Sequence, residues 1–589
     1  METNSKQISK KNNKKILYIL YALFCFVFII FIRLFYLQVE QRAELQFRGE
    51  NNFLKLEVIY PRRGNLLDCK NNLLATNRPV FDIYWEGSGK SKLTQEQVLV
   101  LKKVLEIIGK LDNYKNELSK INKSERLSKR VRISEDIPFD KLCLVSEQCF
   151  DVNNVLIINR FKRLYPYKGF ASHILGHLCR VEAEKLVGRY GLEKIFQDKL
   201  KGHAGYTLHV INSVGKKLER VKMQKAEPGN DIRLTLDLQM QKIAEESFDK
   251  NRSGAFIIMD PQDGAVRVLA SFPTFDPNLF LSPISQKDWD DKLSVNNPFL
   301  NRAIHAVYPP ASIFKLVTIS AGLEEGVIDE NSTFNCKGFT KFCGRKVKCI
   351  KRWGHGELSC QESLAQSCNI ICFEIAKLLK IDQLADYAFR FGFGSKTNFL
   401  ISDKDGLVPT IKWKKLNKGE NWWKGETLSV SIGQTYLLVT PLQVARMLAA
   451  VSSGFLVKPR LLEQEIIEKT PLKISEETLE FLRGAMSVTV TKGTARLLKR
   501  LTKNFDIRAK TGTAQQVSLK KESEMDERFL EHGWFASYFS YKKEKPLVLI
   551  VLVERAGTSR PALLVASKFL EKYARMRERE YRKQKQNKS

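Results

Sequence analysis

The chain has 589 residues, more than one hydrophobic core usually holds, so several domains are expected. Hydrophobic residues make up 43% of it and aromatic residues 10%, which excludes wholesale disorder, and a single long apolar run excludes a polytopic channel. The net charge of +32 suits a polyanionic partner such as nucleic acid, anionic lipid or a wall polymer. It equally suits solvated lysine-rich faces, because the basic residues are spread along the whole chain.

The apolar run lies near the N-terminus. Residues 16–32 are uninterrupted apolar sequence, extended past Arg33 to Leu37, which is long enough to cross a bilayer. Five lysines precede the run: Lys6, Lys10, Lys11, Lys14 and Lys15. This bias keeps the N-terminus in the cytoplasm and exports the rest. No small-x-small site follows the run, so an uncleaved signal anchor is favoured over a cleaved signal peptide.

The stretch after the anchor carries no residue set that indicates catalysis. Residues 40–55 have the spacing of a short helix, and residues 60–86 suggest short strands around turns. Residues 95–110 place their apolar side chains on one helical face. Residues 232–247 begin as an alternating strand and turn into a helix.

Strand patterns return from residue 250. Two apolar runs flank Asp263-Gly264, which predicts a hairpin over 254–270. Three further strands are expected at 505–515, 534–541 and 547–554, and Pro561 opens a final amphipathic helix. Residues 312–500 are mostly helix and loop. The pattern predicts one antiparallel sheet faced by helices, an α+β fold, followed by a solvated tail from Arg575.

One chemical motif is Ser312-Ile313-Phe314-Lys315. At positions i and i+3 of a helix, the Ser312 hydroxyl and the Lys315 amine project from the same face. A neutral lysine can take the proton of a serine nucleophile if its pKa is lowered by burial or by a nearby cation. The motif alone is weak, because Ser-x-x-Lys occurs at four other places in the chain.

The order of three motifs is more specific. Ser367-Cys368-Asn369 opens an apolar helix, and Lys510-Thr511-Gly512-Thr513 lies on a predicted strand. A Ser-x-x-Lys at a helix start, then Ser-x-Asn, then Lys-Thr-Gly on a strand is the signature of serine penicillin-recognising enzymes.

The chain resembles the class B penicillin-binding proteins over about residues 33–577. The segments that carry the resemblance are Arg63–Asp68, Gly191–Lys194, Phe275–Asn278, Asn301–Lys315 and His532–Phe535. Ala311 departs from the family, which usually has glycine before the serine. Cys368 and Gly354-His355-Gly356 point to the elongation-type branch, with the division-type (septal) branch as the alternative.

The resemblance implies an α+β protein with a single transmembrane helix, an elongated pedestal domain of the dimerisation type and a transpeptidase domain. The last domain is expected to hold an antiparallel five-stranded sheet flanked by helices. The implied boundaries are a basic tail at 1–15, an anchor at 16–37, a pedestal at 40–240, a transpeptidase domain at 250–577 and a basic tail at 578–589.

The resemblance also implies roles. Ser312 would attack the D-alanyl-D-alanine bond of a stem peptide, and Lys315 would be its general base. Ser367 and Asn369 would move protons and hold the substrate amide. Lys510 would supply a positive field, and Thr511, Gly512 and Thr513 would bind the substrate carboxylate. Backbone N–H groups of Ser312 and Thr513 would form the oxyanion hole.

The implied function is peptidoglycan D,D-transpeptidation during cell-wall elongation and cell-shape maintenance, with D,D-carboxypeptidation as a side activity. β-Lactams would acylate Ser312. The expected partners are stem peptides and a polytopic glycan polymerase at the inner membrane, with a periplasmic catalytic domain, no nucleic acid and no organic cofactor. A β-lactam sensor, a β-lactamase and a non-enzymatic scaffold of the same fold are the alternatives.

Six of the eleven cysteines crowd into residues 336–372, around a single histidine. A structural zinc site is predicted from Cys336, Cys349, His355 and Cys368, because zinc prefers four nitrogen or sulfur ligands. By resemblance, these residues fall where some elongation-type members hold a metal, although Ile350 stands where the family often has tryptophan. A disulfide among these cysteines, or free buried thiols, is the alternative in an exported chain. Cys343 is the most plausible replacement for one ligand.

Overall fold

A computed structural model describes residues 2–148, 154–181, 186–212, 217–515 and 530–587. The chain divides into two compact units. Unit 1 spans residues 1–62, 78–162 and 202–228, and unit 2 spans residues 63–77, 163–201 and 229–589. Two segments that precede residue 240 in the chain, 63–77 and 163–201, therefore pack with the C-terminal unit.

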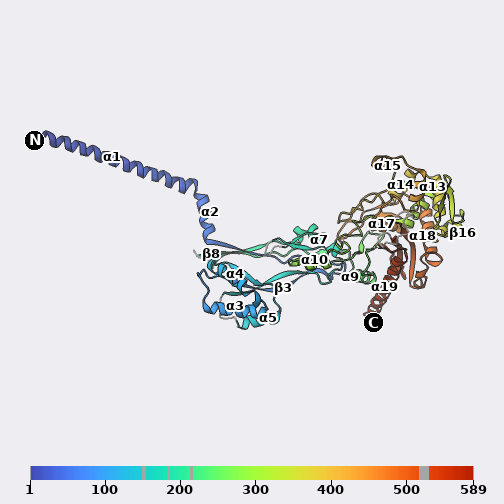
Figure 1. Ribbon diagram of the computed structural model, residues 1–589, viewed down its shortest axis with the longest axis horizontal. Coiled ribbons are helices and arrows are strands. Elements are labelled where there is room, and N and C mark those ends of the chain that lie inside the picture. Colours follow the sequence, from blue (N-terminus) through green and yellow to red (C-terminus); the bar gives the residue numbers. More distant parts are fainter. Residues whose placement is uncertain (1, 149–153, 182–185, 213–216, 516–529, 588–589) are drawn as a thin grey trace. The chain divides into compact units, whose positions relative to one another are not determined.

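Unit 1 begins with a long apolar helix. Helix α1 (Glu2–Phe35) continues through a π-helical turn (Tyr36–Glu40) into α2 (Arg42–Phe53), where a short helix was predicted (Figure 1). Within Ile16–Glu40, a stretch of 18 residues has a mean hydropathy of 2.6, and it is not buried against other parts of the chain. Within the described residues this is the one helical stretch long and apolar enough to cross a bilayer, which fits a single-pass membrane anchor.

The rest of unit 1 combines strands with short helices. An antiparallel sheet has the order β1-β8-β9, formed by Leu54–Ile59, Gly205–Ile211 and Lys217–Gln224. The other elements are β3 (Leu73–Glu86), α3 (Gln95–Ile108), α4 (Tyr114–Arg126), β4 (Arg130–Ser134), α5 (Phe139–Gln148) and β5 (Val155–Leu164). Helix α3 occupies the range predicted for it, and Thr94 caps its first turn together with Gln97.

Unit 2 is organised by a five-stranded antiparallel sheet of order β12-β11-β21-β20-β19. Its strands are β11 (Gly254–Met259), β12 (Val266–Phe272), β19 (Phe505–Ala514), β20 (His532–Tyr541) and β21 (Leu547–Val553). The hairpin and the three C-terminal strands predicted from the sequence are confirmed, as is the α+β class.

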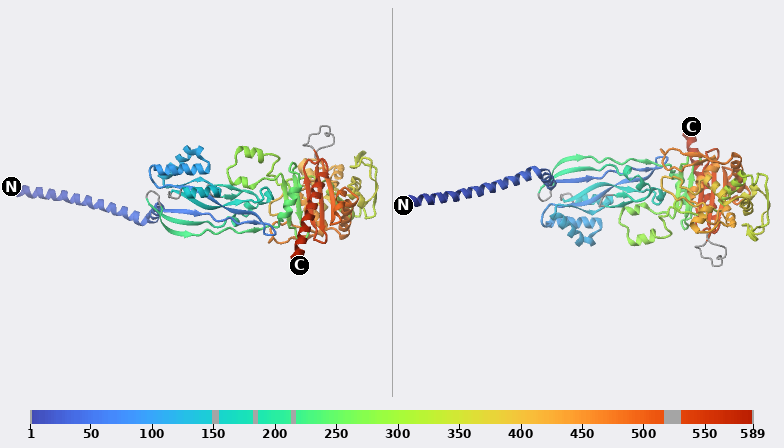
Figure 2. Two further views of the ribbon diagram at one scale, coloured as in Figure 1. Left: turned by 90° about the horizontal axis from the view of Figure 1, so that it is seen from below. Right: turned by 90° about the horizontal axis from the view of Figure 1, so that it is seen from above.

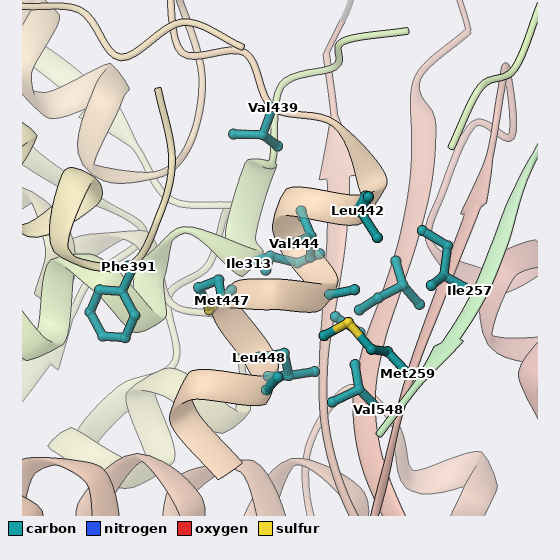
Figure 3. Packing of buried hydrophobic residues seen from close by; sticks show 14 of the residues in the cluster. Ile257, Met259, Ile313, Phe391, Val439, Leu442, Val444, Met447, Leu448 and Val548 are labelled. Atoms are coloured by element: carbon teal, nitrogen blue, oxygen red, sulfur yellow. The ribbon is translucent and has the colours of Figure 1, made fainter. Parts of the chain in front are cut away.

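The sheet is buried on both faces because its strands alternate between two hydrophobic clusters. Ile257 and Met259 of β11 face one cluster together with α17 (Pro441–Ser453), as Figure 3 shows. Phe256 and Ile258 face the other cluster, which includes residues of α19 (Arg560–Gln586), drawn in red in Figure 2. Each fully buried side chain of this size stabilises the fold by about 1.5–3 kcal/mol.

Unit 2 contains further short strands and helices. In the segments before residue 240 they are β2 (Leu66–Leu67), α6 (Ser172–Leu175), β6 (Leu178–Arg180), β7 (Leu186–Gly188), α7 (Gly191–Ile195), α8 (Gln197–Leu200) and β10 (Ile232–Arg233). After it they are α9 (Leu238–Ser247), α10 (Gln286–Lys292), α11 (Lys315–Glu324), β13 (Thr333–Cys336), β14 (Phe339–Phe342), β15 (Arg345–Lys348), β16 (Gly356–Ser359), α12 (Cys360–Ala365), α13 (Asn369–Leu378), α14 (Ile381–Arg390), α15 (Ile411–Lys418), α16 (Lys424–Ser431), β17 (Phe455–Val457), β18 (Lys469–Pro471) and α18 (Glu476–Thr491).

The last helix is longer than the sequence analysis predicted. A solvated tail was expected from Arg575, but α19 continues to Gln586. Arg577 Nη2 donates to Glu544 Oε1 at 2.8 Å, and the Tyr581 hydroxyl donates to the same oxygen at 2.6 Å. These contacts fix the charged part of the helix to the turn that follows β20, which periodicity alone does not reveal.

A buried ion cluster explains two of the sequence landmarks. Glu193 is fully buried and accepts hydrogen bonds from Arg63 Nε at 2.6 Å and from Arg163 Nε at 2.8 Å. The Tyr165 hydroxyl also donates to Glu193, at 3.1 Å. Burial acts to raise the pKa of Glu193, but the two arginine charges outweigh it and the pKa is lowered.

Replacing this carboxylate should therefore destabilise unit 2. We expect Glu193→Gln to cost about 3 kcal/mol, because it leaves two buried guanidinium groups without a counter-charge. Thermal unfolding of the purified protein measures the effect as a fall in Tm. The exposed pair Asp198–Lys201 offers the control: Asp198→Asn should leave Tm unchanged. Equal Tm values for Glu193→Gln and the parent would contradict the assignment.

Candidate active site

Ser312 lies in a tight turn immediately before α11. Residues Ala311–Ile313 form a 3₁₀ turn, and Lys315 is the first residue of the helix. Ser312 and Lys315 are three residues apart, which places them on the same face of the helical segment. Ser312 is partly exposed, whereas Lys315 is fully buried.

The residue before the serine has a left-handed backbone. Ala311 has φ of +50°, and its N–H donates to the carbonyl of Gly433 at 2.9 Å. This conformation favours glycine and costs an alanine about 1–2 kcal/mol. The left-handed backbone at residue 311 therefore explains why the family that the sequence resembles usually has glycine before the serine.

The second motif sits at the start of α13. Ser367 has φ of +58°, Cys368 is the N-cap residue, and Asn369 begins the helix. The two flanking residues turn toward Lys315, while the Cys368 side chain belongs to a separate hydrophobic cluster. The central residue of the motif thus points away from its neighbours.

The third motif lies on the edge strand β19. Lys510 and Thr511 are buried, and the Thr511 hydroxyl is 2.6 Å from the hydroxyl of Thr494. A Cβ atom at Gly512 would lie 3.3 Å from the carbonyl oxygen of Pro310, so glycine lets the strand approach the turn that carries Ser312. Thr513 is partly exposed, and its carbonyl accepts a hydrogen bond from Gln434.

The three motifs converge on the Ser367 hydroxyl. Lys510 Nζ donates to Ser367 Oγ at 2.9 Å, and Lys315 Nζ lies 3.4 Å from the same oxygen. Lys315 Nζ also donates to the Ser367 carbonyl and to Asn369 Oδ1, both at 2.7 Å, and to the Cys368 carbonyl at 3.2 Å. One hydroxyl therefore links the two lysines.

Both amines have lowered pKa values. Burial lowers the pKa of Lys315, against the opposing effect of nearby cysteine thiolates. Burial, together with the charge of Lys315, places the pKa of Lys510 well below its usual range. The pair therefore loses a proton more readily than two exposed lysines would, which suits proton transfer near neutral pH.

Four cysteine and histidine side chains lie behind the second motif. The ligand atoms of Cys336, Cys349, His355 and Cys368 are all within 4.8 Å of one another. Cys349 Sγ is 3.8 Å from Cys368 Sγ, and His355 Nδ1 is 3.4 Å from Cys336 Sγ and 3.6 Å from Cys349 Sγ. Cys343 is exposed at a hairpin turn and is not part of this cluster.

The cluster contacts the catalytic residues through the backbone. The N–H of Asn369 donates to Cys349 Sγ at 3.4 Å, and Lys315 donates to the carbonyl of Cys368. Hydrogen bonds from Cys368 and from the N–H of Asn369 lower the pKa of Cys349, and burial opposes them. The cluster therefore fixes the start of α13.

Several positioning residues were not found from the sequence. The carboxylate of Glu554 accepts a hydrogen bond from the Tyr308 hydroxyl at 2.6 Å and from Arg302 Nε at 3.0 Å. Trp534 Nε1 donates to the carbonyl of Pro309 at 3.0 Å. These contacts tie the segment before Ser312 to the sheet. Tyr308 and Arg302 lie in the family-like segment, but no pattern singles out Glu554.

Gly433 supports the nucleophile turn and offers a sharp test. A Cβ atom on Gly433 would lie 2.1 Å from the carbonyl oxygen of Ala311. Gly433→Ala should displace the turn and slow acylation by a fluorescent penicillin about a hundredfold. Gly326→Ala is the matched control, because Gly326 has a similar φ of +65° and open space around its Cβ position. Normal acylation in Gly433→Ala would show that the turn tolerates the shift.

Comparison with known families gives the class of the protein. Residues 254–572 match the model of the penicillin-binding protein transpeptidase domain, and residues 58–234 match that of the penicillin-binding protein dimerisation domain. The chain belongs to the penicillin-binding proteins that carry a transpeptidase domain.

Individual proteins that resemble this chain indicate which kind of penicillin-binding protein it is similar to. The peptidoglycan D,D-transpeptidase MrdA of Acinetobacter baumannii is 29% identical, over 89% of this chain and 81% of that protein. Penicillin-binding protein 2 of Helicobacter pylori, solved in complex with MreC, aligns with a TM-score of 0.74 at 27% identity, over 89% of this chain and 99% of that one. A chain of a peptidoglycan synthase complex that coordinates polymerization and crosslinking aligns with a TM-score of 0.72 at 28% identity, over 94% and 97% of the two chains.

Proposed function

We propose that this chain is a peptidoglycan D,D-transpeptidase of the elongation type that works through an acyl-enzyme on Ser312. The observation that carries the proposal is the convergence of Lys315 and Lys510 on the Ser367 hydroxyl, next to a partly exposed serine. A non-catalytic protein would gain nothing from burying two amines at this cost.

Lys315 is suited to act as the general base. A neutral amine has two N–H donors and one lone pair. In neutral Lys315 the two N–H groups serve the shortest contacts, to the Ser367 carbonyl and to Asn369 Oδ1, and the longer contact to the Cys368 carbonyl at 3.2 Å is given up. Its lone pair is then left for the proton of Ser312. Ser312 Oγ attacks the carbonyl carbon of the penultimate D-alanine, and the proton passes to Lys315 Nζ.

The remaining steps use the other motif residues. Backbone N–H groups of Ser312 and Thr513 stabilise the oxyanion, and Lys510, Thr511 and Thr513 hold the substrate carboxylate above Gly512. The proton returns through the Ser367 hydroxyl to the departing D-alanine amine. An amine of a second stem peptide then attacks the ester, forms the crosslink and releases Ser312; water in its place gives D,D-carboxypeptidation.

The central experiment is loss of the nucleophile. Ser312→Ala should abolish covalent labelling by a fluorescent penicillin and crosslinking of stem peptides, because only Ser312 forms the ester. Its Tm should equal that of the parent, since a partly exposed hydroxyl with no hydrogen bond to another described residue is removed. A stable penicillin ester on Ser312→Ala would place the nucleophile elsewhere, and an unlabelled parent would favour the scaffold alternative.

The base can be tested separately. Lys315→Arg should acylate as poorly as Lys315→Ala, because a guanidinium group stays protonated. In the parent, the acylation rate should rise with pH as Lys315 loses its proton. Because the pKa of Lys315 is lowered, this rise should occur below pH 10.5, the ordinary pKa of a lysine. Near-normal acylation in Lys315→Arg would refute the base role.

The elongation type is supported by the relatives named MrdA and by the likeness to penicillin-binding protein 2. We place the N-terminus in the cytoplasm and the catalytic unit in the periplasm, with the anchor in the inner membrane. The likeness to a chain of a peptidoglycan synthase complex supports a polytopic glycan polymerase as partner. Depletion of this protein in its own cells distinguishes the two types. Loss of cell shape indicates the elongation type, and filaments blocked at the septum indicate the division type.

The cysteine cluster fits a structural zinc ion. Tetrahedral zinc with Zn–S bonds of about 2.3 Å holds its sulfur ligands about 3.8 Å apart. The 3.8 Å between the sulfurs of Cys349 and Cys368 matches this spacing and is far from the length of a disulfide bond. Bound zinc would supply structural stabilisation only, joining the 336–355 loop to α13 and so fixing Ser367 and Asn369.

Metal analysis tests this part of the proposal. The purified parent should contain about one zinc per chain, and His355→Ala should lose it, with a lower Tm and slower penicillin acylation. Cys343→Ala is the control and should keep its zinc, because Cys343 is exposed and outside the cluster. A metal-free parent that is folded and active, or a Cys349–Cys368 disulfide found by mass spectrometry, would refute the zinc site.

A further inference from the structure

A short segment beside the active site concentrates positive charge. Residues Lys337–Trp353, called the basic flap below, include seven Lys or Arg residues and no Asp or Glu. The seven are Lys337, Lys341, Arg345, Lys346, Lys348, Lys351 and Arg352, and all are exposed. Within the described part of the chain, none of them forms an ion pair with an acidic side chain. Among the described residues, no carboxylate therefore neutralises the charge of the flap, although Lys346 lies over the ring of Phe339 at 4.6 Å and Arg345 over that of Trp423 at 5.9 Å.

The flap has an inner face that packs and an outer face that carries lysines. On the inner face, Phe342 and Val347 pack against the cluster that includes Phe373 of α13, and Thr340 Oγ1 donates to Glu374 at 2.9 Å. These contacts hold the β14–β15 hairpin in place against α13. The hairpin is thus a fixed platform.

The outer face of the hairpin places two like charges opposite each other. Lys341 and Lys346 are directly opposite each other across the hairpin, and Lys348 is on the same face, opposite Phe339. Like charges in directly opposed positions destabilise a strand pair by up to about 1 kcal/mol. A local loss of stability of this kind is expected where a surface binds a ligand of opposite charge.

An exposed indole completes the surface. The side chain of Trp353 is 88% exposed, and it follows Arg352 directly. An indole face can stack on the C–H face of a sugar ring, while neighbouring cations bind carboxylates. This combination suits a carbohydrate polymer with acidic substituents.

The flap begins beside the catalytic residues. Cys349 accepts the hydrogen bond from the N–H of Asn369, whose side chain accepts one from Lys315. Four residues of chain can span at most about 14 Å, so Trp353 stays within that distance of Cys349. A polymer with one stem peptide at Ser312 can therefore reach the flap.

We infer that the basic flap is a binding surface for the anionic peptidoglycan strand whose stem peptides react at Ser312. This inference rests on the proposed function, because that function brings glycan strands with carboxylate-bearing peptides to the site. The flap would hold the strand through its sugars on Trp353 and its carboxylates on the lysines. Affinity for the strand, and not the chemistry at Ser312, depends on it.

The test compares two triple variants in full-length protein carrying Ser312→Ala. One is Lys341→Gln/Lys346→Gln/Lys348→Gln; the control is Lys499→Gln/Lys503→Gln/Lys568→Gln, which removes the same charge from exposed positions elsewhere in unit 2. The probe is soluble uncrosslinked peptidoglycan with pentapeptide stems. We expect the flap variant to bind it about tenfold more weakly at low salt, with a smaller difference at high salt, and the control to bind as before.

Three further measurements complete the test. Trp353→Ala should also weaken strand binding, and strands stripped of their peptides should not distinguish the flap variant from the control. Neither triple variant should have a lowered Tm, and with Ser312 restored both should be acylated normally by penicillin. Equal strand binding by flap variant and control, or flap-dependent binding of anionic phospholipid vesicles in place of strands, would overturn the inference. A parent that penicillin does not label would instead refute the proposed function.

Discussion

The arrangement on which the rest of the site depends is the burial of two amines around one hydroxyl. Lys315 and Lys510 come from a helix and from an edge strand, and Ser367 comes from the turn that starts another helix. Each buried ammonium group costs several kcal/mol unless it is neutralised or surrounded by acceptors. Lys315 donates to carbonyl and amide oxygens of the second motif, and Lys510 donates to the Ser367 hydroxyl and to the carbonyl of Thr511. Helices α11 and α13 and strand β19 must therefore keep a fixed mutual position.

Two strained residues show how the fold meets this requirement. Ala311 and Ser367 both adopt left-handed backbone conformations, each within one residue of a side chain that the mechanism uses. Such conformations persist only where the surroundings leave no alternative. For Ala311 the surroundings include Gly433, whose missing side chain makes room for the carbonyl of Ala311. For Ser367 the surroundings include the cysteine cluster, because Cys368 is a member of it and the N–H of Asn369 donates to Cys349 Sγ.

The sequence alone was enough to predict the antiparallel sheet and to single out the three motifs that converge on Ser367 and the four residues of the cysteine cluster. Each of these rests on a short pattern: a motif, an alternation of apolar residues, or a group of metal-binding side chains. Gly433 and Glu554 could not be predicted in this way, because their roles arise from the approach of segments far apart in the chain. The association of residues 163–201 with the rest of unit 2 likewise involves long-range contacts, such as the hydrogen bond from Arg63 to Glu193 and that from the N–H of Tyr165 to Asn278 Oδ1.

The order of strands in the sheet has a consequence for biogenesis. Strand β11 opens the sheet in the chain, yet one of its two partners is β21, and Gly254 pairs with Val553 near the end of the sequence. The central part of the sheet cannot close until almost the whole polypeptide is present, and non-local pairing of this kind is slow. With the export proposed above, the segment that follows the anchor crosses the membrane in chain order, and this apolar hairpin stays incomplete until late. It therefore needs protection from aggregation for longer than a domain built from neighbouring strands.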